Sequence, residues 1–180
     1  MRSSHGQPVQ RLAATAAAAA VAIMVSACGD EPTVAVGDAV WNDEASRLVL
    51  FNEGGGLGGN PPGSECVTGS AEYTLSISSS ALTSLTTWRC EGAPLRKVAR
   101  QRSLDSAELS ALQPTLRQLT VVDSAQCGAD KPKLTLRVTT AGKTVEYRDS
   151  FYGCLADPRP QVDYMVLDAL QARLAGLLAG

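Results

Sequence analysis

Hydrophobic and polar residues alternate in two pairs of segments, as they do in β-hairpins. In the first pair, Tyr73, Leu75 and Ile77 alternate with polar residues, and a serine-rich turn near 78–81 leads into residues 83–90. A period of two places one face of a strand against a core and the other toward solvent. The pattern therefore predicts a half-buried antiparallel hairpin.

The second pair surrounds the segment TTAGK, whose glycine indicates a tight turn. The hydrophobic positions expected to be buried by this hairpin are Leu134, Leu136, Val138, Val145, Tyr147 and Phe151. Residues 46–51 (SRLVLF) predict a further strand, and residues 93–104 (APLRKVARQRSL) are a weaker candidate because their hydrophobic positions are irregularly spaced.

Two segments have the leucine spacing of amphipathic helices. In residues 104–119, Asp105 and Glu108 have the spacing of a capping box, and Leu104 and Leu109 match a hydrophobic staple. Pro114 is expected to interrupt and kink this helix. Its apolar face is predicted to contain Leu109, Leu112, Leu116 and Leu119, and a final helix at about 162–178 presents Leu167, Leu170, Leu174, Leu177 and Leu178.

These elements together favour an α+β fold, an antiparallel sheet built from hairpins with two helices on one face. Residues 40–180, about 140 in all, have the size of one domain. The pattern leaves the order of the strands open.

The N-terminal region has the features of a secretory signal. Arg2 and Arg11 precede residues 12–27, an alanine-rich run of roughly 16 residues without charge. A membrane-spanning helix needs about 20 apolar residues, so a removed signal at 1–27 is favoured over an uncleaved anchor.

The signal ends in Val25-Ser26-Ala27-Cys28, which resembles the lipobox of bacterial lipoproteins. This resemblance implies that Cys28 receives a diacylglyceryl group, that signal peptidase II cleaves before Cys28, and that the new N-terminus is acylated. Two or more acyl chains give a stable membrane anchor. Residues 28–39 are then the lipidated cysteine and a tether. The expected location is the cell envelope, and the outer membrane in a Gram-negative cell, because Gly29 is not the aspartate that retains lipoproteins in the inner membrane.

Removal of the signal changes the chemistry available to the chain. Without Arg2 and Arg11 the formal net charge moves from −2 to about −4, which argues against a nucleic-acid partner. The only histidine, His5, is removed as well. Nucleophile arrangements that use imidazole, and the commonest ligand of catalytic zinc, are then excluded. We therefore expect no enzyme activity, no cofactor and no metal, with contact to the membrane through the acyl anchor and a protein partner whose identity is open.

The remaining cysteines, Cys66, Cys90, Cys127 and Cys154, predict two disulfides in an exported domain. Folding each predicted hairpin brings together the cysteines at its open end, which favours Cys66–Cys90 and Cys127–Cys154. A four-cysteine zinc site is the alternative, but the wide spacings contain no close cysteine pair.

Other local features favour ordinary structural roles. The glycines of GGGLGG match G-x-G-x-x-G, but 60–63 (NPPG) opposes the helix that a nucleotide-binding loop needs, so a surface loop is expected. Asp149, Asp157, Asp163 and Asp168 do not have EF-hand spacing. Trp41 and Trp88 are expected to pack rather than to bind sugar. The basic cluster, Arg96, Lys97, Arg100 and Arg102, is interpreted as a solvated edge strand or as a contact for anionic lipid or an acidic partner.

One further resemblance covers most of the exported chain. The order of LVLFNEGGGLGG, LDSAELSALQPTLRQL, LTLRVTTAGKTVEYRD and VLDALQARLAGLLA is similar to that in emfourin-type inhibitors of thermolysin-like metalloproteases. This chain differs from that family in having Pro61-Pro62-Gly63 after the glycines and in its additional cysteines. We therefore assign no inhibitory residue from the resemblance. Two functions follow as hypotheses, namely a non-catalytic, lipid-anchored binding or structural module and a lipid-anchored protease inhibitor displaying a loop such as 53–65.

Overall fold

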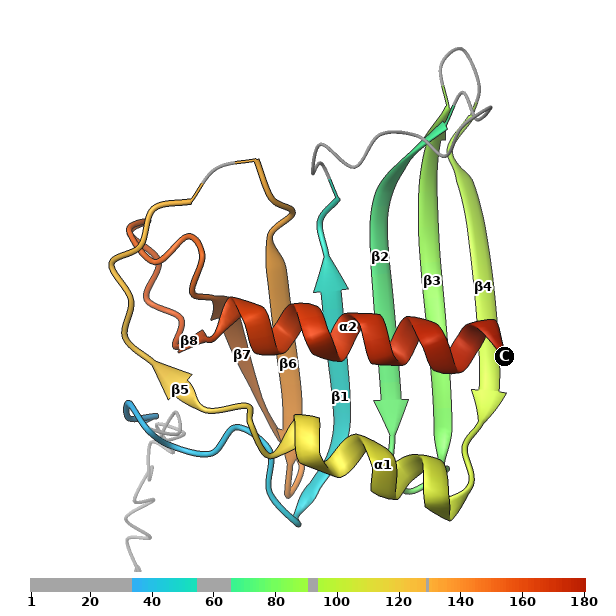
Figure 1. The fold of residues 1–180 in the computed structure, drawn as a ribbon, viewed down its shortest axis with the longest axis horizontal. Helices are drawn as coiled ribbons and strands as arrows, with labels where there is room; N and C mark the ends of the chain where they lie inside the picture. Colours follow the sequence, from blue (N-terminus) through green and yellow to red (C-terminus); the bar gives the residue numbers. More distant parts are fainter. Residues whose placement is uncertain (1–33, 55–65, 91–93, 129) are drawn as a thin grey trace, which may run out of the picture. The chain divides into compact units, whose positions relative to one another are not determined.

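The computed structural model describes residues 34–54, 66–90, 94–128 and 130–180, which lie in one compact unit, Pro32–Gly180. Its strands form one sheet with the order β4-β3-β2-β1-β6-β7-β8-β5 (Figure 1). The strands are β1 (Ala45–Asn52), β2 (Cys66–Ser76), β3 (Ala81–Cys90), β4 (Arg96–Ser103), β5 (Val121–Val122), β6 (Leu134–Thr140), β7 (Lys143–Asp149) and β8 (Gln161–Val162).

Both predicted hairpins are present, in the register that their hydrophobic alternation requires. In β2–β3, Leu75 lies opposite Leu82, and both side chains are fully buried. In β6–β7, Leu136 lies opposite Tyr147. The turn of this second hairpin has positive φ at both Ala141 (48°) and Gly142 (80°). Two positive φ values are typical of the type I′ turn, whose twist matches that of the strands it joins.

β1 lies between the hairpins and joins them into one sheet. It pairs antiparallel with β2 on one side and with β6 on the other. Leu48 and Leu50 of β1 are fully buried, while Arg47 on the other face is exposed. The short strands β5 and β8 were not predicted, because two residues are too few to show a period. β8 runs parallel to β7, so the sheet is mostly rather than wholly antiparallel.

The two helices, α1 (Ser106–Leu116) and α2 (Tyr164–Ala179), lie on the same face of the sheet (Figure 1). The predicted capping box is present, since the Asp105 carboxylate accepts from the backbone N–H of Glu108 and the Glu108 carboxylate accepts from that of Asp105. The expectation that Pro114 interrupts the helix is wrong, because α1 continues to Leu116. Proline so close to a helix end removes one of the last hydrogen bonds without separating two helical segments.

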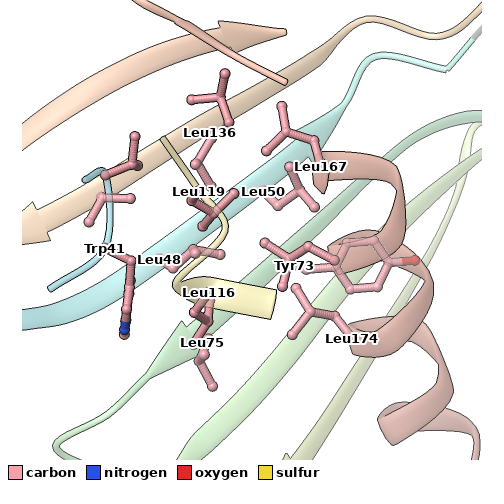
Figure 2. Close-up of a cluster of buried hydrophobic side chains, with 14 of the residues drawn as sticks. Trp41, Leu48, Leu50, Tyr73, Leu75, Leu116, Leu119, Leu136, Leu167 and Leu174 are labelled. Atoms are coloured by element: carbon pink, nitrogen blue, oxygen red, sulfur yellow. The ribbon is translucent and has the colours of Figure 1, made fainter. Parts of the chain in front are cut away.

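α2 begins at Asp163, whose side chain accepts a hydrogen bond from the backbone N–H of Met165. Leu167, Leu170 and Leu174 are fully buried, as the leucine spacing predicted. Figure 2 shows Leu167 and Leu174 of α2 and Leu116 of α1 close to Leu50 and Tyr73 of the sheet. Burying a leucine side chain contributes about 1.5–3 kcal/mol, so this interface supplies much of the stability of the fold.

The predicted α+β fold is therefore observed, with a mostly antiparallel sheet and both helices on one face. Among the side chains that the structure describes, one disulfide is present, Cys127–Cys154, which is one of the two predicted pairs. Within the described residues, neither helix has the length and apolar character needed to cross a bilayer.

Candidate functional site

β4 forms one edge of the sheet and contains the predicted basic cluster. In the described part of the chain it pairs with β3 alone, so its other edge has no strand beside it. Arg96, Lys97 and Arg100 are exposed on this strand. An open edge presents a row of backbone N–H and C=O groups in a geometry that matches an added strand. Backbone and side chains together make β4 the strongest candidate interaction site.

The side chains of β4 divide between the two faces of the sheet. Arg96 lies opposite Trp88 and Arg100 lies opposite Ser84, which is buried. Directly opposed residues in an antiparallel pair project to the same face, so both arginines are on the side that carries the helices. Lys97 is on the other face.

Arg102 does not belong to the exposed cluster. Its guanidinium donates to the carbonyl oxygen of Leu177 at 2.5 Å and to the carboxylate of Glu108 at 2.5 Å. These contacts connect β4 to the C-terminal end of α2 and to the first turn of α1. The sequence predicted four equivalent cations, but in the structure Arg102 positions the edge strand against the helices.

A hollow of about 110 Å³ lies beside Arg100, between the sheet and the end of α2. The residues that line it include three with hydroxyl groups, Tyr73, Ser84 and Thr86, together with Arg100, Trp88 and Val98. Burial raises the pKa of the Tyr73 phenol, and the positive charge of Arg100 acts in the opposite direction. The phenol is therefore a neutral donor at physiological pH. Hydroxyl donors next to a guanidinium suit a carboxylate or another anionic group.

The ends of β2, β3 and β4 near residues 66, 90 and 96 extend past α2, so neither helix covers them (Figure 1). Trp88 is half-buried there and lines the hollow. Trp41, in contrast, is 6% exposed and belongs to the core. The prediction of a packing role is confirmed for Trp41, while Trp88 lies at the border between the core and the candidate site.

The structure places the predicted cysteines as follows. Cys127 and Cys154 form a disulfide with a Cα–Cα distance of 5.1 Å. The backbones of Cys66 and Cys90 are directly opposed in the β2–β3 ladder, but their side chains are not among those described. The lipobox residues Val25, Ser26, Ala27 and Cys28 lie outside the described residues, as does 55–65, most of the glycine-rich loop.

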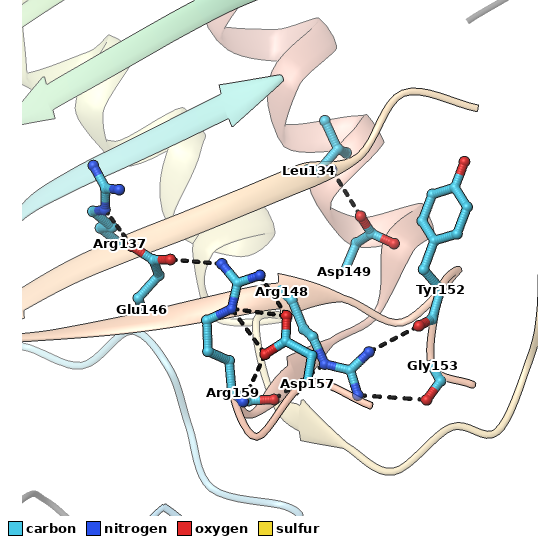
Figure 3. A network of polar contacts seen from close by, with 9 residues as sticks. All are labelled: Leu134, Arg137, Glu146, Arg148, Asp149, Tyr152, Gly153, Asp157 and Arg159. Atoms are coloured by element: carbon cyan, nitrogen blue, oxygen red, sulfur yellow. Dashed lines mark hydrogen bonds and ion pairs between the residues drawn. The ribbon is translucent and has the colours of Figure 1, made fainter. Parts of the chain in front are cut away.

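A buried polar network near the disulfide was not predicted (Figure 3). The Asp149 carboxylate accepts from the backbone N–H groups of Leu134 at 2.7 Å and Phe151 at 3.0 Å. The neighbouring Arg148 donates to three backbone carbonyls, those of Tyr152, Gly153 and Arg159. Both side chains are almost fully buried and satisfy backbone groups of the segment that follows β7, so their role is to fix its path.

The network continues toward the surface through Arg159, which lies between two carboxylates. Its guanidinium pairs with Asp157 at 2.5 Å and with Glu146 at 2.6 Å, and Glu146 also pairs with Arg137 at 2.6 Å. The Arg159 guanidinium lowers the pKa of Asp157 to about 2. The hydrogen bond from Arg137 lowers the pKa of Glu146. These carboxylates are charged at physiological pH and serve to hold the loop after β7.

Three of the four aspartates considered for calcium have separate structural roles. Asp149 binds backbone N–H groups, Asp157 binds Arg159, and Asp163 caps α2. Across 34–54, 66–90, 94–128 and 130–180 no group of three or more metal-binding side chains comes together.

Sequence reasoning missed the hydroxyl-lined hollow, although a signal for it was present. Ser84, Thr86 and Trp88 follow Leu82 at alternate positions of β3 and so lie on the same face as Leu82, which is fully buried. Polar residues that follow a buried leucine at alternate positions indicate that the core gives way to a partly solvated surface along that strand.

The chain was also compared with known proteins. Comparison with protein-family models, with curated proteins and with solved structures found no match for this chain. The residues and geometry of the chain itself are therefore the basis for assigning a function.

Proposed function

We propose that this chain is a lipid-anchored, non-catalytic binding domain of the bacterial cell envelope. In this proposal signal peptidase II removes residues 1–27, acyl chains on Cys28 anchor the protein, and residues 28–39 tether the folded part to the bilayer. The sequence support is the uncharged run before Val25-Ser26-Ala27-Cys28.

The observation that carries the proposal is the disulfide between Cys127 and Cys154. Stable disulfides form in translocated proteins and are rare in the reducing cytosol. The two cysteines belong to segments that follow β5 and β7, and the fold brings their sulfur atoms together. Export is therefore supported by a feature of the folded domain that is independent of the N-terminal signal.

A second disulfide, Cys66–Cys90, belongs to the same proposal. Direct partners in an antiparallel ladder have Cα atoms about 4.5–5.5 Å apart, which lies within the range of about 4.4–6.8 Å found across disulfides. Cys66 and Cys90 are such partners at the end of the β2–β3 ladder. The backbone register supports a bond that would close this end of the hairpin next to the candidate site.

The anchor is tested by labelling cells of the native host with radioactive palmitate. The wild-type chain should incorporate label, and Cys28→Ser should not. Cys154→Ser is the matched control, because it removes a thiol that the proposal leaves unlipidated. Equal labelling of the wild type and Cys28→Ser would refute the anchor. Intact-mass measurement before and after reduction should show a gain of about four hydrogens, two for each disulfide.

The alternative is a lipid-anchored inhibitor of thermolysin-like proteases, displaying the loop 53–65. Most of this loop lies outside the described residues, and the order of elements is what favours the hypothesis. Titration of thermolysin with the full chain separates the two functions. Stoichiometric inhibition would favour the inhibitor, and unaffected proteolysis of a reporter peptide at micromolar protein would remove it.

A further inference from the structure

We infer that β4 recruits an extended, acidic segment of a partner protein, which adds to the sheet as a further strand. The inference gives a partner class to the proposed binding domain and rests on that proposal for its location outside the cytoplasm. It does not depend on acylation, because the site consists of β4 and its neighbours.

The backbone of β4 is suited to pairing with an added strand. Its eight residues are extended and pair with β3, and no strand in the described part of the chain pairs with the opposite edge. A strand of eight residues is about 26 Å long and presents backbone donors and acceptors along that length. Peptides that add a strand to such an edge obtain affinity from main-chain hydrogen bonds and specificity from alternate side chains.

The side chains of β4 determine which peptide fits. Arg96 and Arg100 are four residues apart on the helix side of the sheet, and both are exposed. An added strand would place the residues opposite them on that same face, also four apart. Acidic residues at positions i and i+4 of the partner would thus meet both guanidinium groups. Lys97, on the other face, favours a further acidic residue between them.

The hollow next to Arg100 strengthens this assignment. Tyr73, Ser84 and Trp88 line the same hollow as Arg100, and Ser84 lies directly opposite Arg100 in the β3–β4 ladder. A carboxylate held by Arg100 would have hydroxyl donors within the same hollow. The site therefore combines a backbone edge with a hollow of about 110 Å³ in which hydroxyl-bearing residues lie beside Arg100.

A second copy of this chain is a poorer occupant than an acidic peptide. Two β4 strands paired edge to edge would bring the residues of RKVARQRS against an identical basic sequence. Like charges directly opposed across strands are destabilising. The whole chain has a formal net charge of −2, so the basic strand is a local exception that selects an acidic partner. A lipid headgroup satisfies the charge but forms no strand ladder.

The test measures binding of a fluorescent peptide to the full chain purified in detergent. The parent probe is Ac-Thr-Glu-Thr-Val-Thr-Glu-Thr-Val-Thr-NH₂, in which the glutamates are four apart. Two further probes are N-methylated at all odd or all even positions. Successive N–H groups of a strand point to opposite sides, so only one of these sets faces β4. We expect that one methylated probe binds about tenfold more weakly than the other. Equal affinities would overturn the inference.

The protein side of the test uses variants with equal charge changes. Arg96→Glu combined with Arg100→Glu should weaken binding by about tenfold or more. The control combines Arg47→Glu with Lys143→Glu, both exposed and outside β4, and should stay within about twofold of the wild type. Unfolding midpoints of all variants verify that they are folded, and Arg96→Gln with Arg100→Gln provides a milder change. If both double glutamate variants lose the same peptide affinity, binding is due to general electrostatic attraction and the site at β4 is refuted.

A lipid surface as the occupant is an outcome of the same experiment. The chain is placed in nanodiscs of neutral phosphatidylcholine or of phosphatidylcholine with phosphatidylglycerol. Equal peptide affinity in both discs supports a protein partner at β4. The alternative result is a peptide affinity about tenfold lower in the anionic discs than in the neutral discs. If Arg96→Gln combined with Arg100→Gln abolishes that difference, the strand binds lipid instead. Peptide binding in detergent does not depend on whether Cys28 is labelled by palmitate. The proposed anchor and the proposed binding at β4 can therefore fail independently.

Discussion

Cys127 is linked to Cys154 at the point where the segment after β5 meets the segment after β7. The bond spans 27 residues, and the backbone next to it forms an isolated bridge between Cys127 and Tyr152. Arg148 donates to the carbonyls of Tyr152 and Gly153 on the same segment. A covalent link and a buried guanidinium thus both hold the loop after β7.

Removal of this disulfide should destabilise the folded domain measurably. The double variant Cys127→Ser with Cys154→Ser frees a loop whose closure contributes about 3–4 kcal/mol in the chain-entropy model. The free energy of unfolding, measured by urea denaturation, should fall by about that amount. Arg148 remains in place in this variant, so the native fold should persist. A change below about 1 kcal/mol would contradict the role given to the bond.

The core under α2 offers a comparison of two residues on one helix. Leu167→Ala removes a fully buried side chain and should lower the free energy of unfolding by about 2–5 kcal/mol. Met165→Ala is the control, because Met165 is 67% exposed, and it should change that free energy by less than about 0.5 kcal/mol. Chemical denaturation of both variants gives the measurement. Similar losses would show that α2 does not pack as described.

Local patterns in the sequence were sufficient for most elements of the fold. The alternation at Tyr73 and Leu75 and the leucine spacing of 162–178 each reflect burial of one face, and the structure buries those faces. The Asp105–Glu108 capping box depends on residues three apart and is present as predicted. The pairing of Cys127 with Cys154 followed from hairpin geometry alone.

Features that depend on distant segments were not predictable in this way. The position of β1 between the hairpins requires pairing with residues far along the chain, and no local period encodes it. β5 and β8 form because 119–122 and 160–162 lie next to other segments, not because of their own pattern. Arg148 and Arg102 were missed as structural residues, since an arginine that binds backbone carbonyls looks like a surface arginine in the sequence.

The capping box of α1 should have a measurable effect. Asp105→Ala leaves the backbone N–H of Glu108 without its acceptor. We expect the free energy of unfolding to fall by about 1 kcal/mol. Ser106→Ala, at the next and exposed position, is the control and should be nearly neutral. An unchanged midpoint of thermal unfolding for Asp105→Ala would argue that the cap does not stabilise the domain.

The ion pair between Asp157 and Arg159 should make the stability of the domain depend on pH in the acid range. The Arg159 guanidinium lowers the pKa of Asp157 from 3.8 to about 2. A carboxylate whose folded pKa is below its unfolded value stabilises the fold above the unfolded value, and this stabilisation disappears as the pH falls through the folded value. The contribution should therefore be complete above about pH 5 and lost between about pH 4 and pH 2, with the modest size expected for a partly exposed pair.

Titration of the side-chain carboxyl carbons by NMR measures these pKa values directly. Arg159→Ala should raise the pKa of Asp157 toward 3.8. It should raise the pKa of Glu146 by less, because the hydrogen bond from Arg137 is the larger cause of that lowering and remains in the variant. Lys143→Ala removes an exposed cation elsewhere and is the control, so it should leave the pKa of Asp157 unchanged. If Asp157 titrates near 4 in the wild-type chain, the ion pair with Arg159 does not persist in solution, and the loop after β7 is held by the buried network and the disulfide without it.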